Sequence, residues 1–477
     1  MRVSVFMGPF SRGPQEDKPN IDLCIEQAVQ AAEAGFAMVT FGEQHFNNYE
    51  PYSNPFLMAA RLAPHLGETW FGTTIVPLVF HDPLRLAEDA SVVDLLLAGR
   101  FILGMSAGRV GFSPDFANFG LYAEDRDAIF ASKLDTLRAA FAHEPGDPPI
   151  EVDTPWHRGT LNGRLMPVSH RAGGPLLAIG TNTDATIVRI AEQGTPVFLG
   201  PCTLPDAAAK FRTHRDAAIA AGHSESDVDV MSSRSLVTRH VIVGRTSELA
   251  WERAELMAGA NPMMDRSNDG RSLRELAKVD LAENPDDRNA KHVQSWILAG
   301  DPDEVTAQML AYRAAGVPQL LTRFTVGGYN PDEIRDSFRR FVDHVMPALD
   351  APVFPPLPEH EVRKHESPVL PAVTGLAGTG EIEGKWRVVL DTPMGRQPVE
   401  LELLVDEGSL RGTVTQGGAA VDLADGQVNG QDATFTAAVT QPFPITITYA
   451  VTVAGDTISG TAQAGAFPPS PLTGERA

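Results

Sequence analysis

The chain has 477 residues, 43% of them apolar and 21% charged, which is enough for two or three globular domains with sizeable cores. Lys and Arg number 39 and Asp and Glu number 61, so the net charge is −22, which argues against nucleic acid or an anionic membrane surface as a partner. Two cysteines, Cys24 and Cys202, exclude a disulfide framework, and the histidines show no metal-ligand spacing. Without a secretory signal or a run of about 20 apolar residues, we expect a cytoplasmic protein.

Up to about residue 350, short apolar runs alternate with helical patterns. Eight runs are continuously apolar, as strands buried on both faces are: Val3–Met7, Ala37–Phe41, Phe71–Val76, Phe101–Met105, Leu176–Gly180, Val197–Gly200, Leu236–Val243 and Leu320–Thr325. Helical patterns lie between them, for example from Asp82 or Pro83 to Leu97. Eight repeats favour an α/β fold of the (β/α)8 TIM-barrel class, because no GxGxxG follows the first strand as a dinucleotide fold would require.

Two connections are too long for plain strand–helix units. They run from Gly108 to Gly174 and from Gly244 to Pro318. Long insertions in a barrel usually cover the active-site face or carry a lid. Met263 and Met264 in the second insertion could line such a lid or simply pack.

The composition changes after residue 350. Residues 351–380 are Pro-rich and then Gly-rich, which is typical of a linker. From 381 to 477 the pattern alternates in six segments, separated by turn signals such as Asp425-Gly426 and Asn429-Gly430. We therefore expect a barrel domain over 1–350, a linker over 351–380, and a small antiparallel β barrel or sandwich over 381–477.

Polar and aromatic side chains follow the second predicted strand as Glu43-Gln44-His45-Phe46. Catalytic groups of a (β/α)8 barrel sit at the carboxyl ends of its strands, so this stretch falls at the rim where a site is expected. From the residues alone, an ion pair between Glu43 and His45 within a loop is an equal alternative.

Three stretches resemble the bacterial luciferase-like family of flavin-dependent monooxygenases. They are GFAMVTFGEQHFNNYEPYSNPFLMAARLA, FGTTIVPLVFHDPLRLAEDASVVDLLLAGRFILGMSAGR and DPDEVTAQMLAYRAAGVPQLL. The resemblance covers about residues 1–350 and leaves out the terminal β domain.

The resemblance implies a barrel that binds FMN or reduced FMN at its strand ends, often as a homodimer. In that family, reduced flavin and oxygen form a C4a-hydroperoxide, which oxidises a small organic substrate such as an aldehyde or ketone. Since the barrel has no dinucleotide fingerprint, we expect a separate NAD(P)H:flavin reductase to supply the reduced flavin.

The family's carboxylate-His-His-Phe motif matches Glu43-Gln44-His45-Phe46, so the first histidine is replaced by Gln44. Gln44 can form hydrogen bonds but cannot titrate, which argues against light emission from an aldehyde. His45 is then the candidate acid/base, because an imidazole titrates near neutral pH.

The resemblance also implies the cofactor-binding residues. Ser106 matches a reactive cysteine of the family, and Arg109 matches the arginine that holds the FMN phosphate. Thr181, Asn182, Thr183 and Thr186 look like the family's phosphate loop, the alternative being an ordinary helix N-cap at Thr183 or Asp184. Thr74 and Ile75 match a non-proline cis peptide under the flavin, where Ile75 supports the ring or belongs to the core.

The remaining histidines are given other roles. His81 and Asp82 are expected to cap the following helix. His240 lies in the seventh predicted strand and is expected to pack in the core or to support the site from behind.

Two other functions stay open. One is a deazaflavin-dependent oxidoreductase, since the resembled family also includes hydride transfer without oxygen. The other is a non-catalytic flavin-binding or structural protein. The terminal β domain could serve as an oligomerisation module, a lid or a docking site.

Overall fold

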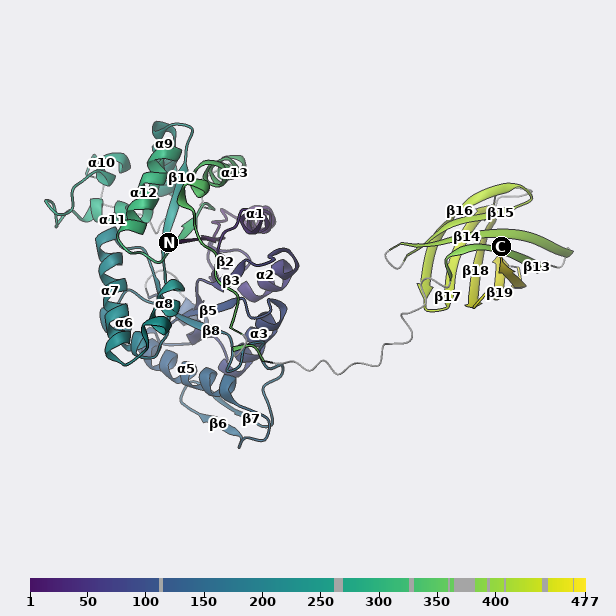
Figure 1. Ribbon diagram of the computed structural model, residues 1–477, viewed down its shortest axis with the longest axis horizontal. Helices are drawn as coiled ribbons and strands as arrows, with labels where there is room; N and C mark the ends of the chain where they lie inside the picture. The colour runs from purple at the N-terminus through teal and green to yellow at the C-terminus, as the bar shows by residue number, and fades with distance from the viewer. Residues whose placement is uncertain are drawn as a thin grey trace. The chain divides into compact units, whose positions relative to one another are not determined.

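A computed structural model describes residues 1–110, 115–260, 269–325, 330–358, 361–363, 382–392, 395–406, 409–439, 445–465 and 467–477. Met263 and Met264, and most of the expected linker, lie outside these residues. The chain divides into two compact units, Met1–Lys364 and His365–Ala477, shown in Figure 1 and described separately below.

Among the described residues of the first unit, eight parallel strands close into a barrel, which confirms the predicted fold. They are β1 (Arg2–Phe6), β2 (Met38–Phe41), β3 (Trp70–Thr73), β5 (Phe101–Ser106), β8 (Leu176–Gly180), β9 (Val197–Leu199), β10 (Leu236–Val243) and β12 (Gln319–Arg323). The barrel closes because β12 pairs with both β1 and β10, and β10 also pairs with β9. Figure 1 shows helices surrounding this sheet.

The helices begin where capping side chains are available. The larger ones are α1 (Pro14–Glu33), α2 (Pro55–Leu62), α3 (Pro83–Leu96), α5 (Arg126–Ala142), α6 (Asp184–Glu192), α7 (Leu204–Ala220), α8 (Glu225–Ser233), α9 (Ser247–Ala260), α11 (Arg288–Trp296), α12 (Pro302–Ala314) and α13 (Pro331–Arg340). Asn54 and Asp82 each accept two backbone N–H groups at the starts of α2 and α3. No helix among the described residues has the length and apolar character that crossing a membrane requires.

Two β segments differ from the sequence prediction. The run predicted as one strand from Phe71 to Val76 is divided into β3 and β4 (Val76–Pro77), with a cis peptide bond between Thr74 and Ile75 separating them. A further parallel strand, β11 (Ile297–Gly300), pairs with β10 and belongs to the second insertion. The first insertion carries α4 (Asp115–Asn118), α5 and a hairpin of β6 (Ile150–Asp153) and β7 (Arg158–Leu161).

The barrel interior is packed at the amino-terminal ends of its strands. Met38, Trp70 and Leu236 belong to this interior cluster, together with Phe354 from the segment that follows α14 (Met346–Leu349). The Phe354 ring centroid lies 4.9 Å from that of Trp70, and the Arg2 guanidinium lies 4.8 Å from the Phe354 ring. Because Arg2 and Trp70 begin their strands, Phe354 covers this end of the barrel.

The second unit is a closed antiparallel barrel of eight described strands, not a sandwich. They are β13 (Gly384–Thr392), β14 (Gly395–Asp406), β15 (Ser409–Gln416), β16 (Ala419–Asn429), β17 (Asp432–Val439), β18 (Ile445–Ala454), β19 (Thr457–Ala464) and β20 (Ser470–Arg476). The six alternating segments of the sequence correspond to β13, β14, β15, β17, β18 and β19, so β16 and β20 were not predicted. Asp425-Gly426 is a bulge within β16 and not a turn, since Asp425 has φ 53° and the register shifts between Ala424 and Gln427.

Candidate active site

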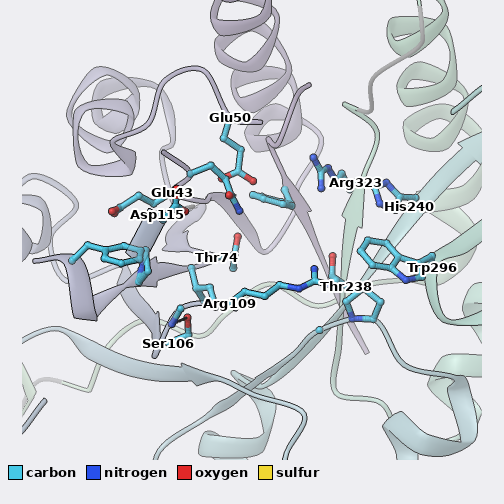
Figure 2. A pocket seen from close by; sticks show the side chains of 18 residues that line it. Glu43, Glu50, Thr74, Ser106, Arg109, Asp115, Thr238, His240, Trp296 and Arg323 are labelled. Carbon is cyan, nitrogen blue, oxygen red and sulfur yellow. Dashed lines mark hydrogen bonds between the residues drawn. The ribbon is translucent and has the colours of Figure 1, made fainter. Parts of the chain in front are cut away.

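A cavity of about 300 Å³ lies at the carboxyl ends of the barrel strands. Apolar side chains line part of it, including Phe6, Ile75, Phe80 and Trp296. Six charged or titratable residues line it as well: Glu43, Glu50, Arg109, Asp115, His240 and Arg323 (Figure 2). Asp115 and Trp296 come from the two long insertions, so both insertions contribute to this end of the barrel, as expected.

Glu43, the first residue of the predicted motif, contacts two histidines. It is 5% exposed, and its Oε1 lies 2.7 Å from both His45 Nε2 and His81 Nε2. Burial opposes ionisation of this carboxyl, but the two imidazoles outweigh burial and hold the pKa of Glu43 below its ordinary value. Glu43 is therefore an anionic group facing the cavity.

His45 lies behind Glu43. Glu43 and Gln44 line the cavity, but within the described residues His45 does not. Its ring packs between Phe80 and Phe119, with centroids 6.2 Å and 4.9 Å away. Among the described residues, the predicted acid/base is therefore connected to the cavity through the carboxylate of Glu43. The expectation that His81 caps the next helix is wrong, because Asp82 alone caps α3 while His81 binds Glu43.

Thr74 and Ile75 both line the cavity, and the peptide bond between them is cis, as the resemblance implies. Thr74 Oγ1 donates to Thr40 Oγ1 at 2.7 Å. The space for Ile75 depends on Gly180 at the end of β8, since a Cβ there would lie 2.6 Å from Ile75 Cδ1. The glycine lets the isoleucine side chain lie against the barrel wall.

The predicted phosphate-binding residues fall into two groups. Ser106 and Arg109 line the cavity, and Arg109 points across it in the direction of Thr238 (Figure 2). Thr181, Asn182, Thr183 and Thr186 do not line the cavity within the described residues but stand at the start of α6.

The start of α6 has a cation that was not predicted. Lys210 from α7 donates to the Asn182 carbonyl at 2.8 Å and to Asp184 at 2.5 Å. Thr183 occupies the N-cap position of α6 without a side-chain capping bond, while Thr181 Oγ1 accepts from Thr183 N at 3.1 Å. Hydroxyls, a helix N-terminus and a lysine therefore lie together here, a set of groups that suits an anion.

Other cavity residues were not predicted as site residues. Thr238 and His240 lie on β10 and Arg323 ends β12. Successive strand residues alternate between faces, so counting every second residue from Leu236, an interior residue, reaches both Thr238 and His240. This alternation could have predicted from the sequence that Thr238 and His240 face the barrel interior.

His240 is buried, and its ring stacks on Trp296 with centroids 5.5 Å apart. Burial, followed by the nearby charges of Arg323 and Arg239, lowers the pKa of His240 well below its ordinary value. The imidazole is therefore neutral and presents a hydrogen-bonding nitrogen, not a charge.

Glu50 was also not predicted. Its backbone has φ 53°, its side chain is 5% exposed, and it lines the cavity. Burial raises the pKa of Glu50 to about 7, with Arg323 opposing the increase and Glu43 adding to it. Arg323 is itself buried, donates to the Gly8 carbonyl and lies 5.0 Å from the Phe6 ring.

Four buried atoms of cavity residues have no hydrogen-bond partner within the part of the chain that the structure describes. They are Glu43 Oε2, Glu50 Oε2, His240 Nδ1 and Arg323 Nε. Buried polar atoms in native proteins are almost always paired, so these four atoms are available to a ligand with its own donors and acceptors. A planar aromatic system with a polar edge, such as isoalloxazine, fits the mixture of apolar and polar groups.

The chain belongs to the luciferase-like monooxygenase family, whose model matches residues 1–319. A 4-hydroxyprotoasukamycin monooxygenase of Streptomyces nodosus subsp. asukaensis is 27% identical over 289 residues, which cover 57% of this chain and 75% of that protein. An F420-dependent glucose-6-phosphate dehydrogenase of Kribbella flavida is 26% identical over 68% of this chain and 93% of its own length.

The uncharacterized protein y4vJ of Sinorhizobium fredii is 34% identical over 138 residues, 29% of this chain, and the match spans only 39% of that protein. A solved structure supports the fold: the oxygenating constituent of 3,6-diketocamphane monooxygenase from Pseudomonas putida, a type II Baeyer–Villiger monooxygenase in complex with FMN. It has a TM-score of 0.57 and 20% identity, and covers 74% of this chain and all of its own.

Proposed function

We propose that the barrel is a flavin-dependent monooxygenase that uses reduced FMN and oxygen to oxidise a small organic substrate of the aldehyde or ketone type. The observation that carries this proposal is the cavity itself, which combines the cis Thr74–Ile75 segment with unpaired polar atoms at the carboxyl ends of a luciferase-like barrel. When bound there, reduced flavin supplies the two electrons with which oxygen is activated.

The chain's own residues position the coenzyme and exclude water. Ile75 would support one face of the ring system, with Ser106 in the same cavity. Arg109, together with the group of Thr181, Asn182, Thr183, Thr186 and Lys210, would hold the phosphate. Glu43 faces the bound molecules, Gln44 donates or accepts a hydrogen bond, and His45 exchanges protons with the cavity through Glu43.

We further propose a separate NAD(P)H:flavin reductase as partner and a cytoplasmic homodimer as the working form. The barrel carries no dinucleotide fingerprint, and the similar Pseudomonas putida protein is described as the oxygenating constituent of its system.

A second candidate is a deazaflavin-dependent oxidoreductase. It is favoured by the F420-dependent dehydrogenase that matches 93% of its own length. A non-catalytic flavin-binding protein is the third candidate, and it predicts coenzyme binding without turnover.

Isotope labelling separates these functions. Reduced FMN, ¹⁸O₂ and a panel of aldehydes and ketones are mixed with the full chain, and products are analysed by mass spectrometry. We expect one ¹⁸O atom per oxidised product. Tight binding of F420 with no binding of FMN in either redox state would instead support the deazaflavin enzyme.

The phosphate contact has its own test. Replacing Arg109 by Met should weaken FMN binding about tenfold or more, because a charge-assisted contact to the phosphate is lost. Riboflavin, which lacks the phosphate, serves as the control ligand and should bind both proteins equally. Equal losses for the two ligands would place the phosphate elsewhere.

A further inference from the structure

Glu50 occupies a backbone conformation that side chains rarely adopt. Its φ of 53° lies in the left-handed region, where glycine meets no steric cost. The chain nevertheless places a carboxyl group there, and the side chain is 95% buried and lines the cavity. A Cβ on Gly42 would collide with this carboxylate, so the neighbouring strand end also leaves room for it.

The groups around Glu50 come from several elements. Arg323 ends β12, and Glu43 and His45 follow β2. Tyr52 donates its hydroxyl to the Met7 carbonyl at 2.7 Å and accepts from Gly42 N, so its hydroxyl is occupied. Cys24 of α1 is fully buried and is also near Glu50 and Arg323. None of these described groups forms a hydrogen bond with Glu50 Oε2.

The proposed reaction requires protons inside the cavity. One oxygen atom enters the substrate, and the other is reduced to water by the two electrons of reduced flavin. Gln44 has no acidic proton to give, and His240 is already neutral. Glu43 is kept ionised by His45 and His81, which leaves it as a proton acceptor.

We propose that Glu50 is an acid/base residue of this site, which donates a proton to an oxygen or nitrogen atom of the bound molecules and recovers one from water. The O–H bond of the carboxyl breaks as the new O–H or N–H bond forms, and no electrons change hands. The carboxylate that remains is stabilised by the nearby Arg323 guanidinium. This inference rests on the proposed function for the identity of the ligand.

Two buried carboxyls placed in different surroundings commonly divide acid and base roles in this way. The imidazoles bonded to Glu43 favour its anionic form, whereas the Glu50 carboxyl has no such bond within the described residues and burial raises its pKa to about 7. Asp115 also lines the cavity, but it is only half-buried.

The first measurement needs no coenzyme. In infrared difference spectra of the ligand-free protein, we expect the C=O band of a protonated carboxyl to disappear near pH 7 and to be absent in Glu50→Gln. Asp94→Asn is the matched control, because burial raises the pKa of Asp94 to about 6. Asp94 belongs to α3 and accepts from Arg171 N, and it does not line the cavity. A band near pH 7 that survives in Glu50→Gln would overturn the inference.

The second measurement uses reduced FMN and F420 as probes. The ratio of wild-type to Glu50→Gln affinities, taken at each pH from 5.5 to 8.5, cancels ionisation of the coenzyme. We expect this ratio to change by up to about tenfold per pH unit above 7. With a substrate that the wild type oxidises, we expect turnover to fall about 10²- to 10⁴-fold in the variant.

Glu50→Gly guards against misfolding, since glycine relieves the positive φ. Glu50→Gly should keep or raise the melting temperature. Like Glu50→Gln, it should lack the pH dependence of coenzyme affinity that the Glu50 carboxyl gives the wild type. A ratio that does not vary with pH, or a turnover profile unchanged in both variants, overturns the role of Glu50. If the wild type binds F420 and not FMN, the proposed monooxygenase function is wrong, but the acid/base role of Glu50 can still hold. If it binds neither coenzyme, both proposals are wrong.

Discussion

At the scale of single residues, Glu50 links function to stability. The folded chain keeps the proton of Glu50 up to about pH 7, whereas an exposed glutamate loses it near 4.5. Between these values the native state binds more protons than the unfolded state, so the free energy of unfolding falls as pH rises. We expect a loss of about 3 kcal/mol across this range, measured by urea unfolding of the full chain.

The Glu50→Gln variant should lack this loss, because the amide does not titrate. Asp94→Asn is the comparison, since Asp94 contributes a loss of the same sign at lower pH, as pH rises from 3.8 to about 6. If the wild type and Glu50→Gln show the same dependence on pH, Glu50 is ionised in the native state and its proposed role fails as well.

The cavity residues also show which site features the sequence carries. Glu43 and Gln44 line the cavity, because residues that directly follow a barrel strand reach the rim. His45 is not among the described lining residues, since the direction of its side chain depends on loop conformation, and Phe46 beside it has φ 55°. The catalytic roles of the three residues stay predictions. Glu50 could not be predicted as a cavity residue, because no local sequence pattern indicates a glutamate in a left-handed backbone conformation.

At the scale of elements, Gly180 at the end of β8 controls the position of Ile75. In Gly180→Ala, the new Cβ would push Ile75 Cδ1 towards the cavity. We expect FMN affinity to fall about tenfold or more while the free energy of unfolding changes by less than about 2 kcal/mol, since only a side-chain end must move. Fluorescence titration and urea unfolding measure the two quantities.

The matched control is Gly259→Ala in α9, where the added Cβ meets no neighbour. This change should leave FMN affinity unaltered and stabilise the helix by up to about 1 kcal/mol. Unchanged FMN affinity in Gly180→Ala would show that the ring does not rest on Ile75.

The barrel strands were predictable because buried parallel strands are apolar throughout, a pattern with few competitors. Strand β11 was missed, since its four residues, Ile297–Gly300, follow a polar insertion and resemble the end of a helix. In the second unit, β16 and β20 are rich in polar and turn-forming residues. Strand β16 pairs only with its sequence neighbours β15 and β17 among the described strands, so its polar composition and not a distant partner hid it. Strand β20 pairs with its neighbour β19 and also with β13 at the start of the unit, a distant pairing that local patterns do not report.

At the scale of the whole molecule, each unit has a core of its own. Trp386, Phe435 and Tyr449 are buried within the second unit, while the first has the barrel core. We therefore expect residues 365–477 to fold alone, with a cooperative transition in calorimetry that also appears in the full chain.

Residues 1–364 should in turn bind FMN within about twofold of the full chain, because the described cavity residues all belong to that unit. A second unit without cooperative unfolding, or a first unit that loses FMN affinity, would show that the two parts depend on each other.

Phe354 closes the amino-terminal end of the barrel. Phe354→Ala removes a buried ring from its contacts with Trp70 and Arg2 and should lower the free energy of unfolding by about 3 kcal/mol. FMN affinity should stay within about twofold, because the cavity is at the opposite end. The neighbouring Val353 is 52% exposed, so Val353→Ala should change stability by less than about 0.5 kcal/mol. Equal effects of the two substitutions would contradict this assignment.

The contact of Phe354 with Trp70 and the packed interior of the barrel also limit where small molecules can enter and leave. With the amino-terminal end packed, the proposed coenzyme and substrate would both enter the described cavity at the carboxyl end of the barrel. We therefore expect the molecule that binds deepest in the cavity to enter first and to leave last, which makes the order of binding and release compulsory.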